Sequence, residues 1–151
     1  MDERILFECR IGNAVEPLAR LLDGLEAAGL EHGWTPSFQM HIALVVEELV
    51  VNAVSYGGQL PGQGWVEVRI ESAEGGVNIL IEDNGQAFDP FSAATPDTEL
   101  DIDSRAIGGL GVHFVRELTQ SQRYERNGAI NRVSLFKRQA DTDPLESGDS
   151  V

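Results

Sequence analysis

Residues 35–58 read TPSFQMHIALVVEELVVNAVSYGG, and this segment predicts the most buried helix of the domain. Thr35 is a favourable N-cap, and Pro36 suits the first helical position because its missing N–H would have no partner there. Gly57 and Gly58 mark the end of the helix. The apolar residues between these signals recur at helical spacing: Phe38, Ile42, Val45, Val46, Leu49, Val50, Ala53 and Val54.

Two polar residues interrupt this apolar helix, Glu48 and Asn52. Four residues apart, they lie one turn from each other on the same stripe, so their side chains can converge on one ligand. A carboxylate among apolar residues needs a partner or a solvent-filled cleft. The alternative is the ordinary solvent edge of an amphipathic helix, which the neighbouring Glu47 favours. We assign Glu47 itself to the surface.

Alternating apolar residues predict strands on both sides of this helix. The first strand is residues 4–11, and two later hairpins turn at Glu74-Gly75-Gly76 and at Asn127-Gly128. The second hairpin pairs residues 122–126 with 129–138. The residues expected on the inner face are Ile5, Phe7, Cys9 and Ile11 in the first strand, then Val66, Val68, Ile70, Val77, Ile79 and Ile81 in the first hairpin.

Helical spacing predicts one more helix before residue 35 and another at residues 110–118. For the earlier one, Asn13 and Glu16 form a capping-box pattern, and Gly29 offers a C-terminal stop. The order of elements is β-α-α-β-β-loop-α-β-β. We therefore expect an α+β sandwich, with a mixed, mostly antiparallel sheet and helices on one face.

A second polar motif, DNGQAFDP at residues 83–90, directly follows the strand that ends in Ile81-Glu82. Asp83 would place an acceptor carboxylate at the mouth of the sheet, where it can accept a hydrogen bond from an exocyclic amine such as that of adenine. Gly85 would let a flat base approach the backbone closely. The alternative is a plain turn, which Asp-Asn-Gly favours by itself.

A third motif, Gly108-Gly109-Leu110-Gly111, stands between a long loop at residues 90–106 and a predicted helix. Glycines at a helix entry leave backbone N–H groups free to bind an anion, and the helix dipole assists them. The alternative is a flexible hinge. The motif is neither a Walker P-loop nor a dinucleotide fingerprint. A loop of this length in a compact domain is usually functional, often a lid.

Together the three motifs resemble the GHKL ATP-binding superfamily, in which Glu-x-x-x-Asn on a helix precedes Asp-x-Gly after a strand and a glycine pair before a helix. Within it, the sequence is most similar to the anti-sigma factor serine kinases of bacterial partner-switching systems. The similarity covers residues 5–138. It rests on VEELVVNA at 46–53, DNGQAFDP at 83–90 with its Phe88, and GGLGV at 108–112 followed by Phe114-Val115-Arg116.

The resemblance implies a role for each motif in binding ATP and Mg²⁺. Asn52 would bind the Mg²⁺ that bridges the ATP phosphates, and Glu48 would orient or deprotonate a serine or threonine hydroxyl. Asp83 would accept from the adenine amine, with Gly85 making room for the ring. The remaining ATP-binding residues carried over are Phe88, Gly108, Gly109, Leu110 and Gly111.

Two positions depart from the pattern of these relatives. Many have His-Gly after the asparagine helix, where this chain has Tyr56-Gly57. Relatives often place an arginine close before the final glycines to touch the γ-phosphate. Here the nearest is Arg105, a little further upstream, and whether it contacts the γ-phosphate stays open. His41 is expected to be a surface or core residue rather than a ligand.

Composition limits the other functions. With 25 acidic residues against 11 Lys plus Arg, the net charge of −14 argues against nucleic-acid and polybasic membrane binding. Five of the acids lie in residues 89–103. One cysteine excludes an internal disulfide, and no signal peptide or membrane span is expected. We expect a cytoplasmic protein with one kinase domain, residues 1–138, and an acidic, disordered tail, residues 139–151.

The resemblance implies an ATP-dependent serine/threonine protein kinase and anti-sigma factor, commonly a homodimer. Such a protein phosphorylates a STAS-domain anti-anti-sigma partner and sequesters a sigma factor or another regulator. One alternative is an ATP-loaded binding switch that no longer transfers phosphate. Another is a histidine-kinase catalytic module, which usually has asparagine where Glu48 stands and needs a phospho-accepting helix pair before the first strand. GHKL ATPases with large extra domains do not fit 151 residues.

Overall fold

The computed structural model describes residues 4–14, 17–58, 62–92 and 110–139, and within them the predicted order of strands and helices is confirmed. The strands are β1 (Ile5–Gly12), β2 (Trp65–Ala73), β3 (Gly76–Asp83), β4 (Ser121–Asn127) and β5 (Ile130–Arg138). The helices are α1 (Leu18–His32), α2 (Pro36–Tyr56) and α4 (Leu110–Leu118).

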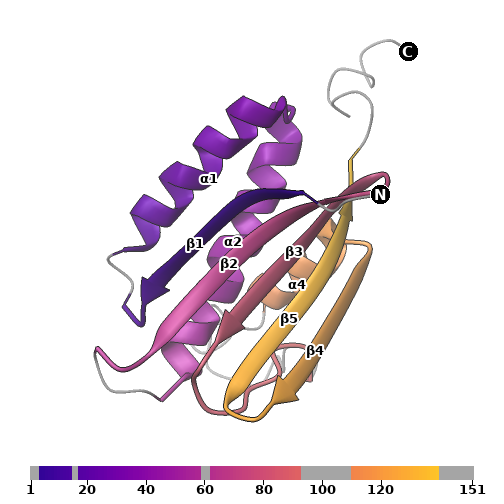
Figure 1. Cartoon of the computed structure of the whole chain (residues 1–151). Coiled ribbons are helices and arrows are strands. Elements are labelled where there is room, and N and C mark those ends of the chain that lie inside the picture. Colours follow the sequence, from indigo (N-terminus) through magenta and orange to yellow (C-terminus); the bar gives the residue numbers. More distant parts are fainter. Residues whose placement is uncertain (1–3, 15–16, 59–61, 93–109, 140–151) are drawn as a thin grey trace.

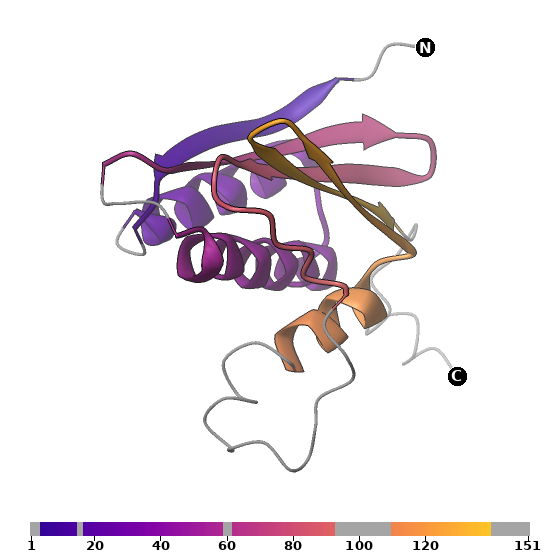
Figure 2. The same ribbon diagram turned by 90° about the horizontal axis from the view of Figure 1, so that it is seen from below.

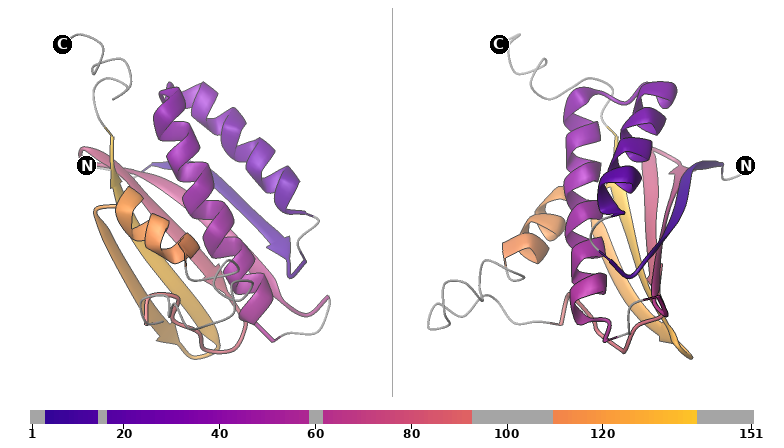
Figure 3. Two further views of the ribbon diagram at one scale, coloured as in Figure 1. Left: turned by 180° about the vertical axis from the view of Figure 1, so that it is seen from behind. Right: turned by 90° about the vertical axis from the view of Figure 1, so that its left-hand side faces the viewer.

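The strands form one sheet in the order β1-β2-β3-β5-β4, and every pairing is antiparallel. Figures 1 and 3 show all three helices on the same side of this sheet, with α2 between α1 and α4. In the view from below, the sheet forms one layer and the helices the other (Figure 2). The predicted α+β sandwich with helices on one face is confirmed, whereas the sheet, expected to be mixed and mostly antiparallel, is antiparallel throughout the described strands.

The core lies between α2 and the inner face of the sheet. Thr35 caps α2 as predicted, because its hydroxyl accepts a hydrogen bond from the Phe38 N–H at 3.2 Å. Among the described helices, α2 alone is long and apolar enough to cross a membrane. Its apolar stripe is instead buried against the strands, so we assign it to the core. The fully buried side chains of the helix and the sheet include Ile42, Val45, Val46, Val50, Val66, Val68, Ile70, Val77 and Ile79.

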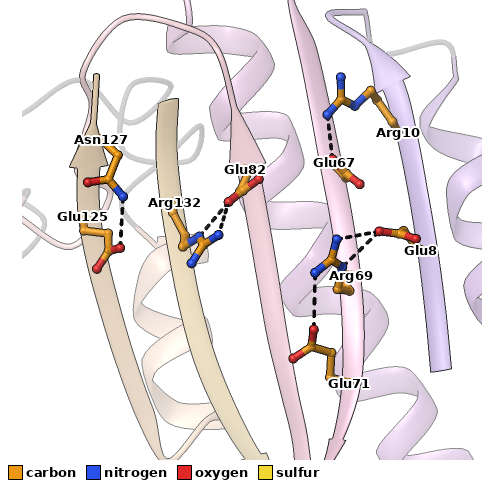
Figure 4. Close-up of polar contacts among 9 residues, drawn as sticks. All are labelled: Glu8, Arg10, Glu67, Arg69, Glu71, Glu82, Glu125, Asn127 and Arg132. Carbon is orange, nitrogen blue, oxygen red and sulfur yellow. Dashed lines mark hydrogen bonds and ion pairs between the residues drawn. The ribbon is translucent and has the colours of Figure 1, made fainter. Parts of the chain in front are cut away.

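The opposite face of the sheet is open and carries paired charges (Figure 4). Arg69 contacts both Glu8 (2.7 Å) and Glu71 (3.4 Å), while Arg132 contacts Glu82 at 2.6 Å. Two more pairs join Arg10 to Glu67 and Arg123 to Glu125. These pairs are partly exposed, so each contributes little to stability. They show that alternation along the strands separates an apolar inner face from a charged outer one.

Three local predictions were wrong. Helix α1 begins at Leu18, so Asn13 does not cap it; the Asn13 side chain accepts from the Gly62 N–H instead. The helix continues past Gly29 to Gly33, which has φ 75°. Gly29 is needed for packing, because a Cβ there would overlap the Gln39 side chain. Ile5 is 50% exposed, since the register shifts between it and Phe7.

Candidate functional site

The three sequence motifs lie at one end of the domain. This end combines the C-terminal half of α2, the end of β3 and the first turn of α4. Two close approaches connect them: Glu48 lies against Gly111, and Gly57, just after α2, lies against Gly85, just after β3. Helix α2 also packs on α4 and on β3. Tertiary packing therefore gathers residues that are up to 63 positions apart in the sequence, as Glu48 and Gly111 are.

Glu48 is half-buried beside a fully buried Asn52. Asn52 is only 3% exposed, and both Asn52 Oδ1 and Glu48 Oε2 are buried without a hydrogen-bond partner among the described residues. Burial raises the pKa of Glu48, the neighbouring charge of Glu47 raises it further, and the Asn52 amide opposes the shift. Buried polar atoms are costly unless they are satisfied. Two orphaned oxygens one turn apart therefore make this part of α2 the candidate ligand site.

The unpaired Asn52 oxygen fits the predicted magnesium site. Mg²⁺ prefers oxygen ligands and is usually held by one or two protein oxygens together with substrate phosphates. A buried amide oxygen with no protein donor can supply one of these ligands. No cluster of three or more His, Cys, Asp or Glu side chains forms a metal cage within the described ranges. The buried, unpaired Asn52 oxygen thus fits a metal that would arrive with a nucleotide.

Asp83 presents one carboxylate oxygen to its own protein and leaves the other unused. Its Oδ1 accepts from the Gly85 N–H (2.8 Å) and from the Asn131 amide (2.9 Å). Burial raises the pKa of Asp83, while these two hydrogen bonds and the nearby charge of Arg126 lower it. Within the part of the chain that the structure describes, no donor reaches Oδ2. That oxygen is the one available to an exocyclic amine.

Gly85 has a reason to be glycine beyond the room for a base that the sequence predicts. A Cβ on Gly85 would lie 2.6 Å from the Cα and 2.9 Å from the carbonyl oxygen of Gly57. The same backbones are joined where the Gln86 N–H donates to the Gly57 oxygen at 2.7 Å. Backbone cannot move aside as a flexible side chain can. Gly57 and Gly85 therefore hold the end of α2 against the loop after β3.

Sequence reasoning missed the residues that hold the Asp83 loop in place. Asn131 donates to Asp83 and to the Gln86 carbonyl, and it accepts from the Tyr124 hydroxyl. Arg126 donates to the Gly85 carbonyl at 2.7 Å. A signal for Asn131 was present, because it occupies the first inward-facing position of β5 and an amide there needs partners.

The predicted Phe88 stacks on the ring of Tyr56, with centroids 4.6 Å apart and planes 18° from parallel. Tyr56 is the residue that stands where relatives have histidine. A hydrogen bond also joins the Asp83 loop to the end of α2, because the Gln86 side-chain amide donates to the Tyr56 carbonyl at 2.9 Å. Phe88 is thus placed beside the end of α2, on the loop that carries Asp83.

The glycine motif is described only from Leu110, the first residue of α4, and Arg105, Gly108 and Gly109 lie outside the described residues. Gly111 is brought to Glu48: a Cβ at this position would overlap the carboxylate. Arg116, on the same helix, donates to the Phe91 carbonyl and lies over the Phe91 ring. Helix α4 is therefore tied directly to the segment that follows the Asp83 loop.

A larger cavity lies away from the three motifs. It measures about 450 Å³ and lies by the β2–β3 turn, lined among others by Arg4, His32 and Trp34. The turn is about 23 Å from Asp83, the length of seven residue steps along β3. The small cavity beside Asp83, of about 10 Å³, holds no more than one water.

Comparisons with known proteins identify the family of this chain. Residues 12–137 match the model of the histidine kinase-like ATPase domain. The serine/threonine-protein kinase BtrW of Bordetella bronchiseptica is 25% identical over 116 residues, which cover 77% of this chain and 82% of BtrW.

Among solved structures, the RsbU and RsbW domains of Rv1364c from Mycobacterium tuberculosis share the fold, with a TM-score of 0.64 at 17% identity over 90% of this chain. The match spans a third of that longer protein. Most of the present chain is covered by the family model, and the predicted GHKL resemblance is confirmed. The chain belongs to the family of histidine kinase-like ATPase domains.

Proposed function

We propose that this protein is an ATP-dependent serine/threonine kinase that acts on a protein partner. The observation that carries the proposal is the pair of orphaned oxygens on α2, Glu48 Oε2 and Asn52 Oδ1. One is a carboxylate able to take a proton, and the other is a metal-type oxygen ligand. The similarity to BtrW supports a serine/threonine kinase over a histidine kinase. So does Glu48 itself, where histidine kinases usually have asparagine.

The proposed chemistry assigns three tasks to three parts of the site. Glu48 orients the attacking serine or threonine hydroxyl and takes its proton, and its raised pKa makes it a stronger base than an ordinary glutamate. Asp83 and its loop hold the adenine. Asn52 would hold Mg²⁺, which when bound would neutralise charge on the phosphates. Phosphoryl transfer needs little more than such positioning and electrostatic stabilisation.

The proposed substrate is a STAS-domain anti-anti-sigma protein, and the proposed second partner is a sigma factor or another regulator. Both come from the resemblance to partner-switching kinases, which also supports the proposal of a cytoplasmic protein that acts in transcription regulation. The kinase domain is proposed to end at residue 138, with an acidic tail beyond it. The five acids of residues 89–103 lie in or beside the loop predicted to be a lid and give it a charge suited to a basic partner surface.

We also propose a homodimer formed through the open face of the sheet. The ion pairs there join five glutamates to four arginines, so their charges nearly cancel in a protein of net charge −14. A second copy can therefore pack on this face without strong repulsion. Light scattering on the purified protein measures the mass. A mass of one chain at micromolar concentration would contradict the homodimer.

Phosphotransfer is tested by incubating the protein with Mg-ATP and the STAS protein encoded nearest to its gene. Mass spectrometry should find phosphoserine or phosphothreonine on the STAS protein, and Glu48→Gln should abolish it while ATP still binds. Exchange of partners without any phosphorylated product would instead identify a binding switch. Absence of ATP binding would contradict both functions.

A further inference from the structure

Asn131 is placed to decide which nucleobase Asp83 accepts. It lies on β5 directly opposite Asp83 of β3, and it is 3% exposed. Its amide nitrogen donates to Asp83 Oδ1 (2.9 Å) and to the Gln86 carbonyl (2.8 Å). Its amide oxygen accepts from the Tyr124 hydroxyl and from the Phe88 N–H (3.4 Å). The side chain therefore uses both amide hydrogens and both lone pairs.

The four partners fix the orientation of this amide. Two acceptors, Asp83 Oδ1 and the Gln86 carbonyl, face the nitrogen, while two donors face the oxygen. A flipped amide would set an oxygen against the Asp83 carboxylate and hydrogens against the Phe88 N–H, which can only donate. The Tyr124 hydroxyl can donate or accept, so it fixes the position of the amide from β4, outside the loop, while the acceptors Asp83 and Gln86 fix its orientation. The donor to Asp83 is thus built into the sheet.

This donor limits what Asp83 can bind. A carboxylate oxygen has two lone pairs, and Oδ1 already accepts from the Gly85 N–H and from Asn131. Only Oδ2 is left for a ligand. One free oxygen accepts one amine hydrogen, as adenine offers. Guanine offers N1–H and the 2-amine side by side, and it needs both carboxylate oxygens for a paired contact.

We infer that Asn131, held by Tyr124, is a positioning residue that makes the site select adenine over guanine by occupying Asp83 Oδ1. The inference rests on the proposed ATP site and deepens it. Asn131 acts through Asp83, and its effect is on the choice of base rather than on phosphate binding. Replacing it would open a lone pair on Oδ1 and allow guanine its second hydrogen bond.

The test compares the affinities of Mg-ATP, Mg-GTP and Mg-ITP by calorimetry for the full chain and for Asn131→Leu and Tyr124→Phe. Inosine carries N1–H without the 2-amine, so it separates the paired contact from a single one. In Asn131→Leu, the preference for ATP over GTP should fall by about tenfold or more, as one hydrogen bond is worth, and GTP should gain more than ITP. Tyr124→Phe should change the preference in the same direction by a smaller factor.

Thr119→Val is the matched control, because it also removes a buried hydrogen bond with little change of shape. The Thr119 hydroxyl donates to the Val115 carbonyl, away from the Asp83 loop. Thr119→Val should lower the free energy of unfolding without changing the ratio of the affinities for ATP and GTP. If Asn131→Leu does not fold, Tyr124→Phe still decides. An unchanged ratio in a folded variant would overturn the role of Asn131, whereas a wild-type protein that binds no ATP would overturn the proposed function.

Discussion

The carboxylate of Glu48 fills the space that a side chain at Gly111 would need. Glu48 lies on α2 and Gly111 in the first turn of α4, so the absence of a Cβ lets the two helices meet around the proposed catalytic group. The atoms that a Cβ would overlap are the far end of a flexible side chain, not backbone. The contact therefore constrains Glu48 more than it constrains the fold.

Gly111→Ala should impair phosphotransfer while leaving the protein at least as stable. Alanine in a helix is favoured over glycine by about 0.5–1 kcal/mol, but its methyl group would push the Glu48 carboxylate aside. We expect kcat to fall by about tenfold or more, since misplacement by about 1 Å is costly. Kinase assays and thermal unfolding measure the two effects. Gly12→Ala, where a Cβ meets nothing within 4 Å, is the control; equal losses in both variants would contradict the prediction.

The rate of phosphotransfer should rise with pH through the titration of Glu48. Its pKa is raised, so the carboxylate that accepts the proton is lost on acidification earlier than in an ordinary glutamate. Glu47→Gln removes a neighbouring charge that raises this pKa, so the acid limb of the profile should move to lower pH. Initial rates at saturating Mg-ATP between about pH 5 and 8 measure it. An acid limb at the same pH in both proteins would argue against Glu48 as the base.

Asp83→Asn should abolish ATP binding without lowering stability near neutral pH. The folded-state pKa of Asp83 is raised, so its stabilising contribution is complete below the unfolded pKa and is lost as pH rises through the folded one. Removing the charge therefore leaves the free energy of unfolding at pH 7 unchanged or higher. Asparagine keeps an Oδ1 acceptor but puts hydrogens where Oδ2 was. Calorimetry and urea unfolding test both halves, and retained ATP affinity would refute the assignment.

Gly85→Ala should destabilise the whole domain. The new methyl group would meet the Gly57 backbone at 2.6–2.9 Å, and relieving that contact means separating the end of α2 from the Asp83 loop. Overpacking of this kind costs roughly 1–3 kcal/mol. A matching fall in the free energy of unfolding, with weaker ATP binding, is the expected result. Unchanged stability would show that the Gly57–Gly85 approach can open freely.

Mg-ATP should raise the melting temperature only when Asn52 is intact. A ligand at a hundredfold excess over its Kd adds about 2.7 kcal/mol to the stability of the native state. Asn52→Ala removes the orphaned oxygen assigned to Mg²⁺, so the Mg²⁺-dependent part of the shift should disappear. Thermal scans with ATP in the presence of Mg²⁺ or of EDTA separate the two parts. A Mg²⁺-dependent shift that survives in Asn52→Ala would place the metal elsewhere.

Much of the fold could be predicted because it depends on local signals. The Thr35-Pro36 start of α2, the inward valines and isoleucines of β2 and β3, and the Asn127-Gly128 turn all agree with the structure. The errors came where packing overrode a local signal. Gly29 predicted a helix end because glycine often follows the last residue of a helix. Only the position of Gln39 in the fold shows that Gly29 is needed for close packing.

For the candidate site, too, the sequence predicts the chemical groups, whereas the tertiary structure sets the contacts between them. The sequence sets the chemistry, since Glu48 and Asn52 are one turn apart on any helix and Asp83 must follow its strand. Only the tertiary structure brings Gly111 to Glu48, sets Gly57 against Gly85 and pairs Asn131 with Asp83. These contacts join segments tens of residues apart. They depend on strand order and helix packing, which no local pattern encodes.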